Sequence, residues 1–329
     1  MGRTSHILVC GGAGYIGSHL VRHLLERGHR VTVFDNLSTG HRAAVGNADF
    51  AEGDLLDSAA LGRVFARAPV DAVVHFAALS IVADSVRDPE RYRRNNVDGT
   101  VNLVRAMRQA GVRRLVFSSS AAVYGNAPGE WIDEEAPKQP INPYGASKAM
   151  AEDALADACR DGGLAVASLR YFNAAGAHPS GMIGESHQPE THLIPNVLRI
   201  AAGADAGPVQ IFGRDYPTAD GTCIRDYVHV DDLADAHRRA LAWLEGRDGF
   251  HPFNLGSGRG FSVLEVLEAA CRVAGRPIRS IDAPRRSGDP HRLVASITRA
   301  EQMLGWLPLC SDLDTMLETA WRWHRAPRF

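Results

Sequence analysis

The glycine pattern Gly11-x-x-Gly14-x-x-Gly17 constrains the fold of this chain more than any other feature of its sequence. It follows directly on a short apolar run, His6 to Cys10, which has the composition of a buried strand. Apolar residues then recur at helical spacing until Gly28, and a second apolar run ends at Asp35. Strand, glycine turn, helix and second strand span about 30 residues, the size of a β-α-β unit. The N-terminal segment therefore predicts the start of a parallel sheet.

A glycine turn between a strand and a helix predicts a nucleotide cofactor. Glycine lets the backbone approach a pyrophosphate, and the helix N-terminus offers unpaired N–H groups and the positive end of the helix dipole. Asp35 closes the second strand, where a carboxylate accepts hydrogen bonds from an adenosine ribose and repels a 2′-phosphate. The unit therefore predicts NAD as the cofactor, in preference to NADP.

The alternation of strand and helix patterns continues along the chain. Short apolar runs predict strands at 49–52, 72–76, 114–118, 165–169 and 252–255, and helical periodicity predicts helices at 59–67, 90–110 and 144–160. Strands that alternate with helices in this way are typical of a doubly wound parallel sheet. The predicted fold class is therefore α/β, with a Rossmann-type sheet.

The pattern changes after Asn173. Residues 178–190 are rich in Pro, Gly, Ser and His and predict a long loop. A helix at 193–202 and a strand at 209–212 should follow, and Asp231 or Asp232 should cap a helix that ends near Leu244. Further helices are predicted near 262–273, 298–304 and 312–324. We expect residues 1–173 to form an NAD-binding domain that also receives 226–258, while 174–225 and 259–329 form a smaller C-terminal substrate-binding lobe.

Composition excludes several classes of protein. A net charge of −2 gives no general attraction to nucleic acid or to an anionic membrane, and no apolar run reaches the ~18 residues of a membrane span. The five cysteines are odd in number and far apart, which argues against a disulfide framework and a zinc site and indicates a reducing cytoplasm. We expect no metal site. His19 and His23 are interpreted as lying on a helix surface.

Tyr144 and Lys148 form the most distinctive pair in the second half of the predicted sheet domain. The chain has only two lysines, Lys138 and Lys148, among 36 basic residues. A lysine one helical turn from a tyrosine places a cation beside the phenol, which favours the phenolate. The run Ser118-Ser119-Ser120 ends a strand just upstream and offers a hydroxyl. Active sites of doubly wound folds lie at the carboxyl ends of the strands, so this set predicts proton transfer next to the cofactor.

These motifs together resemble the extended short-chain dehydrogenase/reductase superfamily and, more closely, the UDP-glucose 4-epimerase family. The resemblance covers nearly the whole chain. Its most specific part lies after residue 170, and includes Arg170-Tyr-Phe-Asn173, Gly176-Ala-His-Pro-Ser-Gly181 and Arg225-Asp-Tyr-Val-His-Val230. Dehydratases that act on nucleotide sugars resemble the chain too, but carry Thr-Asp-Glu where Ser120-Ala121-Ala122 stands, so elimination is disfavoured.

The resemblance implies a reaction and a set of residues. Tyr144 would act as general base and then acid at the sugar C4 hydroxyl, Lys148 would tune Tyr144 and hold the nicotinamide ribose, and Ser120 would assist proton transfer. The implied cofactor positions are Gly11, Gly14, Tyr15, Ile16, Gly17, Asp35, Asn36, Ser38, Thr39, Gly40, Asp54, Leu55, Phe76, Ala77, Ala78, Ser80, Asn95, Lys148 and Phe172. The implied substrate positions are Ser120, Tyr144, Asn173, His192, Leu193, Gln210, Phe212, Arg225, Arg286 and Asp289, with Arg225 and Arg286 on the diphosphate.

The identity of the sugar stays open at this point. The resemblance implies interconversion of UDP-glucose and UDP-galactose by a cytoplasmic homodimer, with helices 90–110 and 144–160 at its interface. Leu293, near a position that is Tyr or a smaller residue in the family, leaves UDP-N-acetylhexosamines and UDP-pentoses as alternatives. A non-catalytic dinucleotide sensor is a more remote alternative. His187 and His192 are interpreted as lining the substrate pocket and not as metal ligands.

Overall fold

A seven-stranded sheet organises the protein in the computed structural model, which describes residues 4–160, 162–204, 207–286 and 289–329. The strand order is β10-β6-β5-β4-β1-β2-β3, and every neighbouring pair is parallel. The prediction of a doubly wound parallel sheet is therefore confirmed.

The sheet-domain elements, in chain order, are β1 (His6–Cys10), α1 (Tyr15–Leu25), β2 (Arg30–Asp35), η1 (Arg42–Val45), β3 (Asp49–Glu52), α2 (Ser58–Arg67), β4 (Ala72–His75), α3 (Val82–Arg87), α4 (Pro89–Arg93), η2 (Arg94–Asp98), α5 (Gly99–Gln109), β5 (Arg114–Ser120), η3 (Ala121–Val123), α6 (Pro143–Arg160) and β6 (Ala165–Tyr171). The later elements are β7 (Asn173–Ala175), α7 (Leu193–Ala201), β8 (Val209–Phe212), β9 (Ile224–His229), α8 (Val230–Trp243), β10 (Gly249–Leu255), β11 (Gly260–Ser262), α9 (Val263–Ala274), β12 (Ser280–Ala283), β13 (Arg292–Leu293), η4 (Ala300–Leu304) and α10 (Leu313–Arg325).

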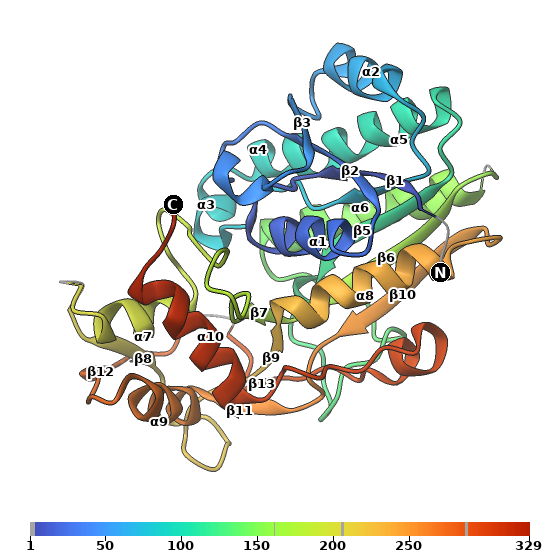
Figure 1. Ribbon diagram of the computed structural model, residues 1–329. Helices are drawn as coiled ribbons and strands as arrows, with labels where there is room; N and C mark the ends of the chain where they lie inside the picture. The colour runs from blue at the N-terminus through green and yellow to red at the C-terminus, as the bar shows by residue number, and fades with distance from the viewer. Residues whose placement is uncertain (1–3, 161, 205–206, 287–288) are drawn as a thin grey trace.

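Helices cover both faces of this sheet (Figure 1). Helices α1 and α8 share one apolar core with one face of the strands, whereas α2, α5 and α6 share a second core with the other face. Strands that are covered by helices on both faces have mostly apolar sequences, because both sets of side chains are buried. All four residues of β4 are buried in this way. Among the described helices, none is long and apolar enough to cross a membrane.

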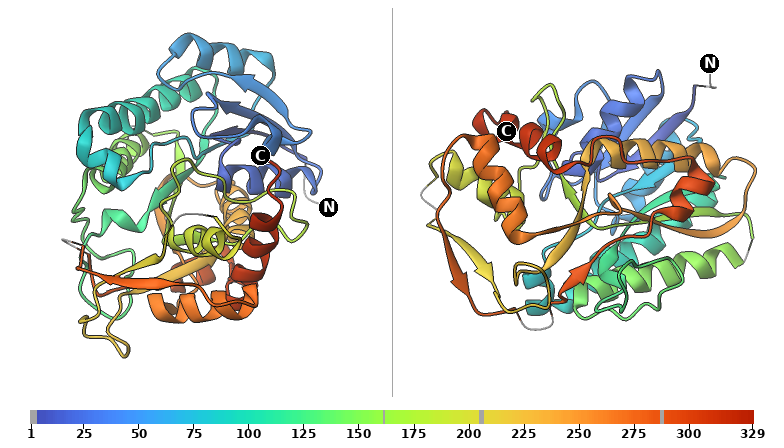
Figure 2. Two further views of the ribbon diagram at one scale, coloured as in Figure 1. Left: turned by 90° about the vertical axis from the view of Figure 1, so that its left-hand side faces the viewer. Right: turned by 90° about the horizontal axis from the view of Figure 1, so that it is seen from below.

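A second body of structure follows β6 (Figure 2). The chain passes from β6 into β7, which pairs with β9, and β9 also pairs with β11 and β13. Strands β8 and β12 form a separate parallel pair. Helices α7, α9 and α10 pack on these small sheets around a third apolar core. Between β9 and β11 the chain returns to the large sheet, as α8 on its face and as β10 at its edge.

Three local expectations are wrong. His229, and neither Asp231 nor Asp232, caps α8, because its Nδ1 accepts a hydrogen bond from the backbone N–H of Asp231. The helix expected at 90–110 is interrupted by the π-helical turn η2. His19 is buried, since the face of α1 that carries it packs against α8, and its Nδ1 lies 2.8 Å from the Tyr15 carbonyl oxygen.

Helix α6 is anchored to the sheet by a buried ion pair. Glu152 is fully buried, and its carboxylate accepts hydrogen bonds from Nε and Nη2 of Arg170 at 2.8 and 2.7 Å. The same carboxylate accepts hydrogen bonds from the hydroxyls of Ser119 and Ser168. Glu152 therefore joins α6 to β5 and β6 through four charge-assisted hydrogen bonds, which are stronger than neutral ones.

Removing the charge of Glu152 should lower the free energy of unfolding of the protein. Glu152→Gln leaves the Arg170 guanidinium buried without its counterion, and breaking a buried pair in this way costs about 3–5 kcal/mol. Urea unfolding of the purified variant measures the loss. Asp248→Asn is the matched control, because it breaks the exposed Arg113–Asp248 pair and should cost less than about 1 kcal/mol. Equal losses for both variants would contradict the anchoring role.

Candidate active site

The carboxyl edge of the large sheet collects most of the residues singled out in the sequence. The glycine turn follows β1, Asp35 ends β2, and Asp54 and Leu55 follow β3. Phe76, Ala77, Ala78 and Ser80 follow β4, Ser120 ends β5, and Phe172 follows β6. Parallel strands bring these sequence-distant positions to one edge, where doubly wound folds bind their ligands.

The glycine turn is packed so tightly that side chains are excluded from two of its positions. A Cβ at Gly11 would lie 2.4 Å from the Ala77 amide nitrogen, and one at Gly17 would lie 2.2 Å from the Gly11 carbonyl oxygen. Gly14 caps helix α1 without any side-chain cap, so the first turn of the helix presents its N–H groups to the edge of the sheet. This is the form of cradle that a pyrophosphate requires.

Asp35 is held in place by two backbone groups. Its carboxylate accepts hydrogen bonds from the amides of Ala13 and Leu37, at 3.0 and 2.8 Å, and burial raises its pKa. In the segment after Asp35, Ser38 and Thr39 are exposed and Gly40 packs against Ala13. Asn36 donates to Asp54 at 2.8 Å, and both line a groove of about 340 Å³ beyond the second strand. The set fits the ribose and adenine end of a dinucleotide.

An asparagine pair builds a wall beside the segment that follows β4. Asn95 and Asn96 lie in the π-helical turn η2, and Asn95 donates to the Asn96 side chain at 2.9 Å. Asn96 in turn accepts from the Leu79 amide and donates to the Ser147 hydroxyl. Because Ser147 donates to the Tyr144 carbonyl oxygen, this wall is connected to the start of α6.

Tyr144, Lys148 and Ser120 meet where β5 faces α6. The Ser120 side chain lies close enough to the Tyr144 phenol to lower the pKa of that phenol. The Lys148 ammonium, which is 3% exposed, donates to the Ser118 carbonyl oxygen at 2.9 Å and lies 5.0 Å from the centre of the Phe117 ring. The structure therefore brings the three residues of the predicted proton-transfer set to one place.

Burial dominates the acidity of this site. It raises the pKa of the Tyr144 phenol, while the Ser120 side chain acts in the opposite direction. Burial also lowers the pKa of Lys148 to about 7, and the Glu152 carboxylate one turn further along α6 opposes that shift. Because the pKa of Lys148 lies near neutrality, a charge brought next to its ammonium group would strongly change the fraction that is protonated.

The predicted substrate residues form a second group on the small sheets. Arg225 on β9 is ion-paired with Asp289, and the Arg286 guanidinium lies 4.0 Å from the centre of the Phe212 ring. Gln210 is exposed on β8. Asn173 connects this group to the sheet edge, because its side chain donates to the Asp226 carbonyl oxygen at 2.8 Å.

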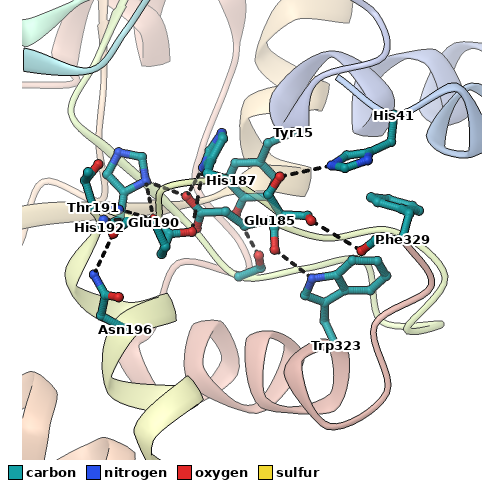
Figure 3. Close-up of polar contacts among 12 residues, drawn as sticks. Tyr15, His41, Glu185, His187, Glu190, Thr191, His192, Asn196, Trp323 and Phe329 are labelled. Atoms are coloured by element: carbon teal, nitrogen blue, oxygen red, sulfur yellow. Dashed lines mark hydrogen bonds and ion pairs between the residues drawn. The ribbon is translucent and has the colours of Figure 1, made fainter. Parts of the chain in front are cut away.

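The long loop that leads into α7 is bound to the glycine-turn helix. The Tyr15 phenol donates to the Gly176 carbonyl oxygen at 2.6 Å, so Tyr15 joins α1 to this loop. His192 precedes Leu193 at the start of α7 and contacts Glu185, as Figure 3 shows. Burial lowers the pKa of His187, but contacts with Glu185 and Glu190 outweigh it and raise the pKa to about 10.

Sequence reasoning missed several residues that position the site. Asn96 and Ser147 orient the wall and the start of α6, and Tyr171 is hydrogen-bonded to Ser118. Glu152 could have been found, since it follows Lys148 by one helical turn on the same face. Glu185 and Glu190 carry no such signal, because isolated carboxylates in a polar loop are ordinary surface residues.

Comparison with known proteins agrees with this geometry. The family model described as NAD dependent epimerase/dehydratase matches residues 7–256. A UDP-glucose 4-epimerase of Lacticaseibacillus casei is 51% identical over 97% of this chain and 96% of its own. One crystal structure of a UDP-glucose 4-epimerase superposes with a TM-score of 0.95 at 47% identity, covering 98% of both chains.

A second crystal structure, the UDP-glucose 4-epimerase of Brucella ovis in complex with NAD, also has a TM-score of 0.95, at 46% identity, and covers 98% of this chain and 99% of its own. Both similarities extend over the sheet domain and the small sheets alike. The chain therefore belongs to the NAD dependent epimerase/dehydratase family and, within it, to the UDP-glucose 4-epimerases.

Proposed function

We propose that this protein is an NAD-dependent 4-epimerase that interconverts UDP-glucose and UDP-galactose through a transient 4-keto sugar. The observation that carries the proposal is the meeting of Tyr144, Ser120 and Lys148 at the carboxyl edge of the sheet, beside a pyrophosphate cradle. Relatives named UDP-glucose 4-epimerase match the chain over nearly its full length, which supports the same substrate.

Tyr144 is the proposed acid and base. Its phenolate takes the proton of the C4 hydroxyl and returns a proton after the keto sugar has rotated in the pocket. Lowering a phenol pKa from ~10 to ~7 takes about 4 kcal/mol, and Lys148, on the same face of α6, supplies one cation toward it. Ser120 holds the sugar oxygen and the phenol in hydrogen-bonding contact.

The residues at the sheet edge fit NAD. The first turn of α1 would hold the pyrophosphate, Asp35 the adenosine ribose, and Asn36 and Asp54 the adenine side. Lys148 would hold the nicotinamide ribose, and Phe76, Asn95 and Phe172 would contribute further contacts to the cofactor. The bound nicotinamide supplies a reversible hydride acceptor for the sugar C4.

The small sheets are proposed to hold the UDP part of the substrate. Arg225 and Arg286 carry the two guanidinium groups that suit a diphosphate, and each is already oriented by a partner, Asp289 and the Phe212 ring. Asn173, His192, Leu193 and Gln210 would complete the pocket. In this division of the chain, the cofactor is bound by residues 1–173 together with 226–258. The substrate is bound by residues 174–225 together with 259–329.

The identity of the sugar can be determined directly by a turnover assay. The protein is incubated separately with UDP-galactose, UDP-N-acetylgalactosamine and UDP-xylose, and the products are resolved by chromatography. The fastest turnover should be with UDP-galactose. Faster turnover of either other sugar would establish that alternative, and no turnover of any would favour the non-catalytic dinucleotide sensor.

Tyr144→Phe should abolish most of the activity while it leaves the cofactor in place. General acid–base catalysis contributes about 10²–10⁴-fold, so kcat should fall by that factor. Turnover of UDP-galactose and the NAD released on denaturation are both measured. Retained NAD with lost turnover separates a chemical role from a failure to fold, and unchanged kcat would remove Tyr144 from the mechanism.

Two glycine substitutions should separate folding from cofactor binding. At Gly17 a Cβ would overlap the Gly11 carbonyl oxygen, whereas at Gly14 the nearest atom is that oxygen at 3.5 Å, an ordinary contact. Gly17→Ala should therefore lower the melting temperature of the NAD-free protein, and Gly14→Ala should not. Gly14→Ala should still weaken NAD binding about tenfold, or about 1.4 kcal/mol, by crowding the pyrophosphate. Calorimetric titration with NAD tests this, and wild-type affinity would contradict the cradle.

We also propose a cytoplasmic homodimer. All five cysteines are free thiols, as expected in a reducing compartment. A groove between α5 and α6 is lined in part by apolar side chains, among them Val101, Val104 and Leu155, and would be covered by the same face of a second copy.

Val101→Glu should convert the dimer into a monomer, because it would bury a carboxylate at the proposed interface. Light scattering coupled to size exclusion measures the mass. Leu309→Glu is the control, since Leu309 is the most exposed large apolar residue among those described and lies outside the two helices. A monomeric wild-type protein, or a dimeric Val101→Glu variant, would refute this interface.

A further inference from the structure

Four metal-ligating side chains converge in the loop before α7. Glu185, His187, Glu190 and His192 come from eight consecutive residues, and Figure 3 shows their side chains pointing toward one another. One donor atom from each residue lies within 4.8 Å of the other three. The cluster lies outside the Tyr144–Lys148–Ser120 set, and from the sequence we expected no metal site.

The spacing of the donor atoms fits a four-coordinate ion. Nδ1 of His187 lies 3.1 Å from Oε1 of Glu185 and 3.7 Å from Oε2 of Glu190. Nδ1 of His192 lies 2.5 Å and 3.5 Å from Oε1 of the same two carboxylates. A tetrahedral zinc ion with ligands at about 2.0–2.2 Å has donor atoms about 3.3–3.6 Å apart. Three of the four distances, 3.1, 3.5 and 3.7 Å, lie close to that range. To bind an ion, the hydrogen-bonded His192–Glu185 contact at 2.5 Å would lengthen, and one Glu190 oxygen would turn toward both imidazoles.

The loop that carries the cluster is held from outside it. The Trp323 indole donates to the Glu185 backbone carbonyl oxygen at 2.7 Å, and the Ser186 hydroxyl donates to the backbone oxygen of Phe329. Oε1 of Glu190 accepts from the amides of Thr191 and His192 at 2.8 and 2.9 Å. Both carboxylate side chains are nearly fully buried, at 4% and 2% exposed, whereas the His192 side chain is 55% exposed. The acidic ligands are thus preorganised, and an ion could enter past His192.

Charge balance agrees with a divalent ion. Two buried carboxylates carry two negative charges, which need two positive charges in the same small volume. One divalent ion replaces the two protons that the imidazoles otherwise place against the carboxylates. Two imidazoles with two carboxylates suit zinc and its neighbours, whereas calcium and magnesium prefer six or more oxygen ligands.

We propose that Glu185, His187, Glu190 and His192 bind one divalent transition-metal ion of the zinc class, through both imidazole Nδ1 atoms and one oxygen of each carboxylate. Four protein ligands close the coordination sphere, which is the form of a structural site. The ion fastens the loop to the start of α7 and lies next to Tyr15, whose ring centre is 6.3 Å from that of His187. Ligation through Nδ1 leaves Nε2 of His192 for a substrate contact.

Cobalt substitution tests the site on the intact protein. The purified protein is treated with a chelator, freed of it, and titrated with CoCl₂ and, separately, with ZnCl₂ in a calorimeter. We expect one ion per chain, the visible absorption of four-coordinate cobalt, and a higher melting temperature with zinc. The absence of stoichiometric uptake would overturn the proposal and leave the four residues as an ion-pair cluster.

Matched variants locate the ion. His187→Gln and Glu190→Gln should each weaken cobalt binding at least about tenfold, in line with the loss of one ligand of four. His178→Gln is the control, because His178 lies earlier in the same loop and its Nδ1 contacts the Ser180 hydroxyl, outside the cluster. Equal affinity in all three variants would overturn the assignment. So would a thiolate-to-cobalt charge-transfer band, which would place the ion on a cysteine, or displacement of cobalt by excess magnesium. Unchanged NAD content in the variants excludes general misfolding as the cause of lost binding.

Discussion

The ion pair between Glu152 and Arg170 is the interaction on which the rest of the site depends. Both side chains are almost fully buried, so the pair is stable only because every charge is matched and hydrogen-bonded. Arg170 also donates to the Tyr124 phenol, which donates to the Asn254 side chain on β10. One polar network therefore joins α6 to three neighbouring strands. Tyr144 and Lys148 occupy the first two turns of that same helix, so their distance from Ser120 is set by this anchor.

The same carboxylate interacts with both lysines of a chain rich in arginine. Lys138 lies 3.6 Å from Glu152, and the Glu152 charge opposes the loss of the proton from Lys148. Lys148 fits between the Ser118 carbonyl oxygen and the face of the Phe117 ring, a space suited to a compact ammonium. A planar guanidinium needs five donors satisfied and could not be tuned by burial, because it stays charged.

The sheet and its edge could be predicted because their signals are local. Apolar runs, the glycine spacing and the carboxyl-end position of Asp35 and Ser120 each lie within a few residues. Of the small sheets, only β8 was predicted, at 209–212. The sheet around β9 could not be predicted, since β7, β9 and β13 are two to six residues long and pair only with strands far away in sequence. The cap of α8 was missed for a different reason. Imidazole is a less common cap than the carboxylates of Asp231 and Asp232, which follow it directly.

Tyr15 couples the two halves of the site. It begins the helix whose first turn faces the cofactor position. Its phenol donates a hydrogen bond to the Gly176 carbonyl oxygen, in the loop that leads to α7. Burial and the charges of Glu185, Asp231 and Glu190 raise the pKa of this phenol, so it remains a neutral hydrogen-bond donor. A hydrogen bond therefore ties the helix after the glycine turn to the loop, and the loop is in turn hydrogen-bonded to Trp323 and Phe329. The geometry at the sheet edge thus depends on residues that lie more than 300 positions after the turn in the sequence.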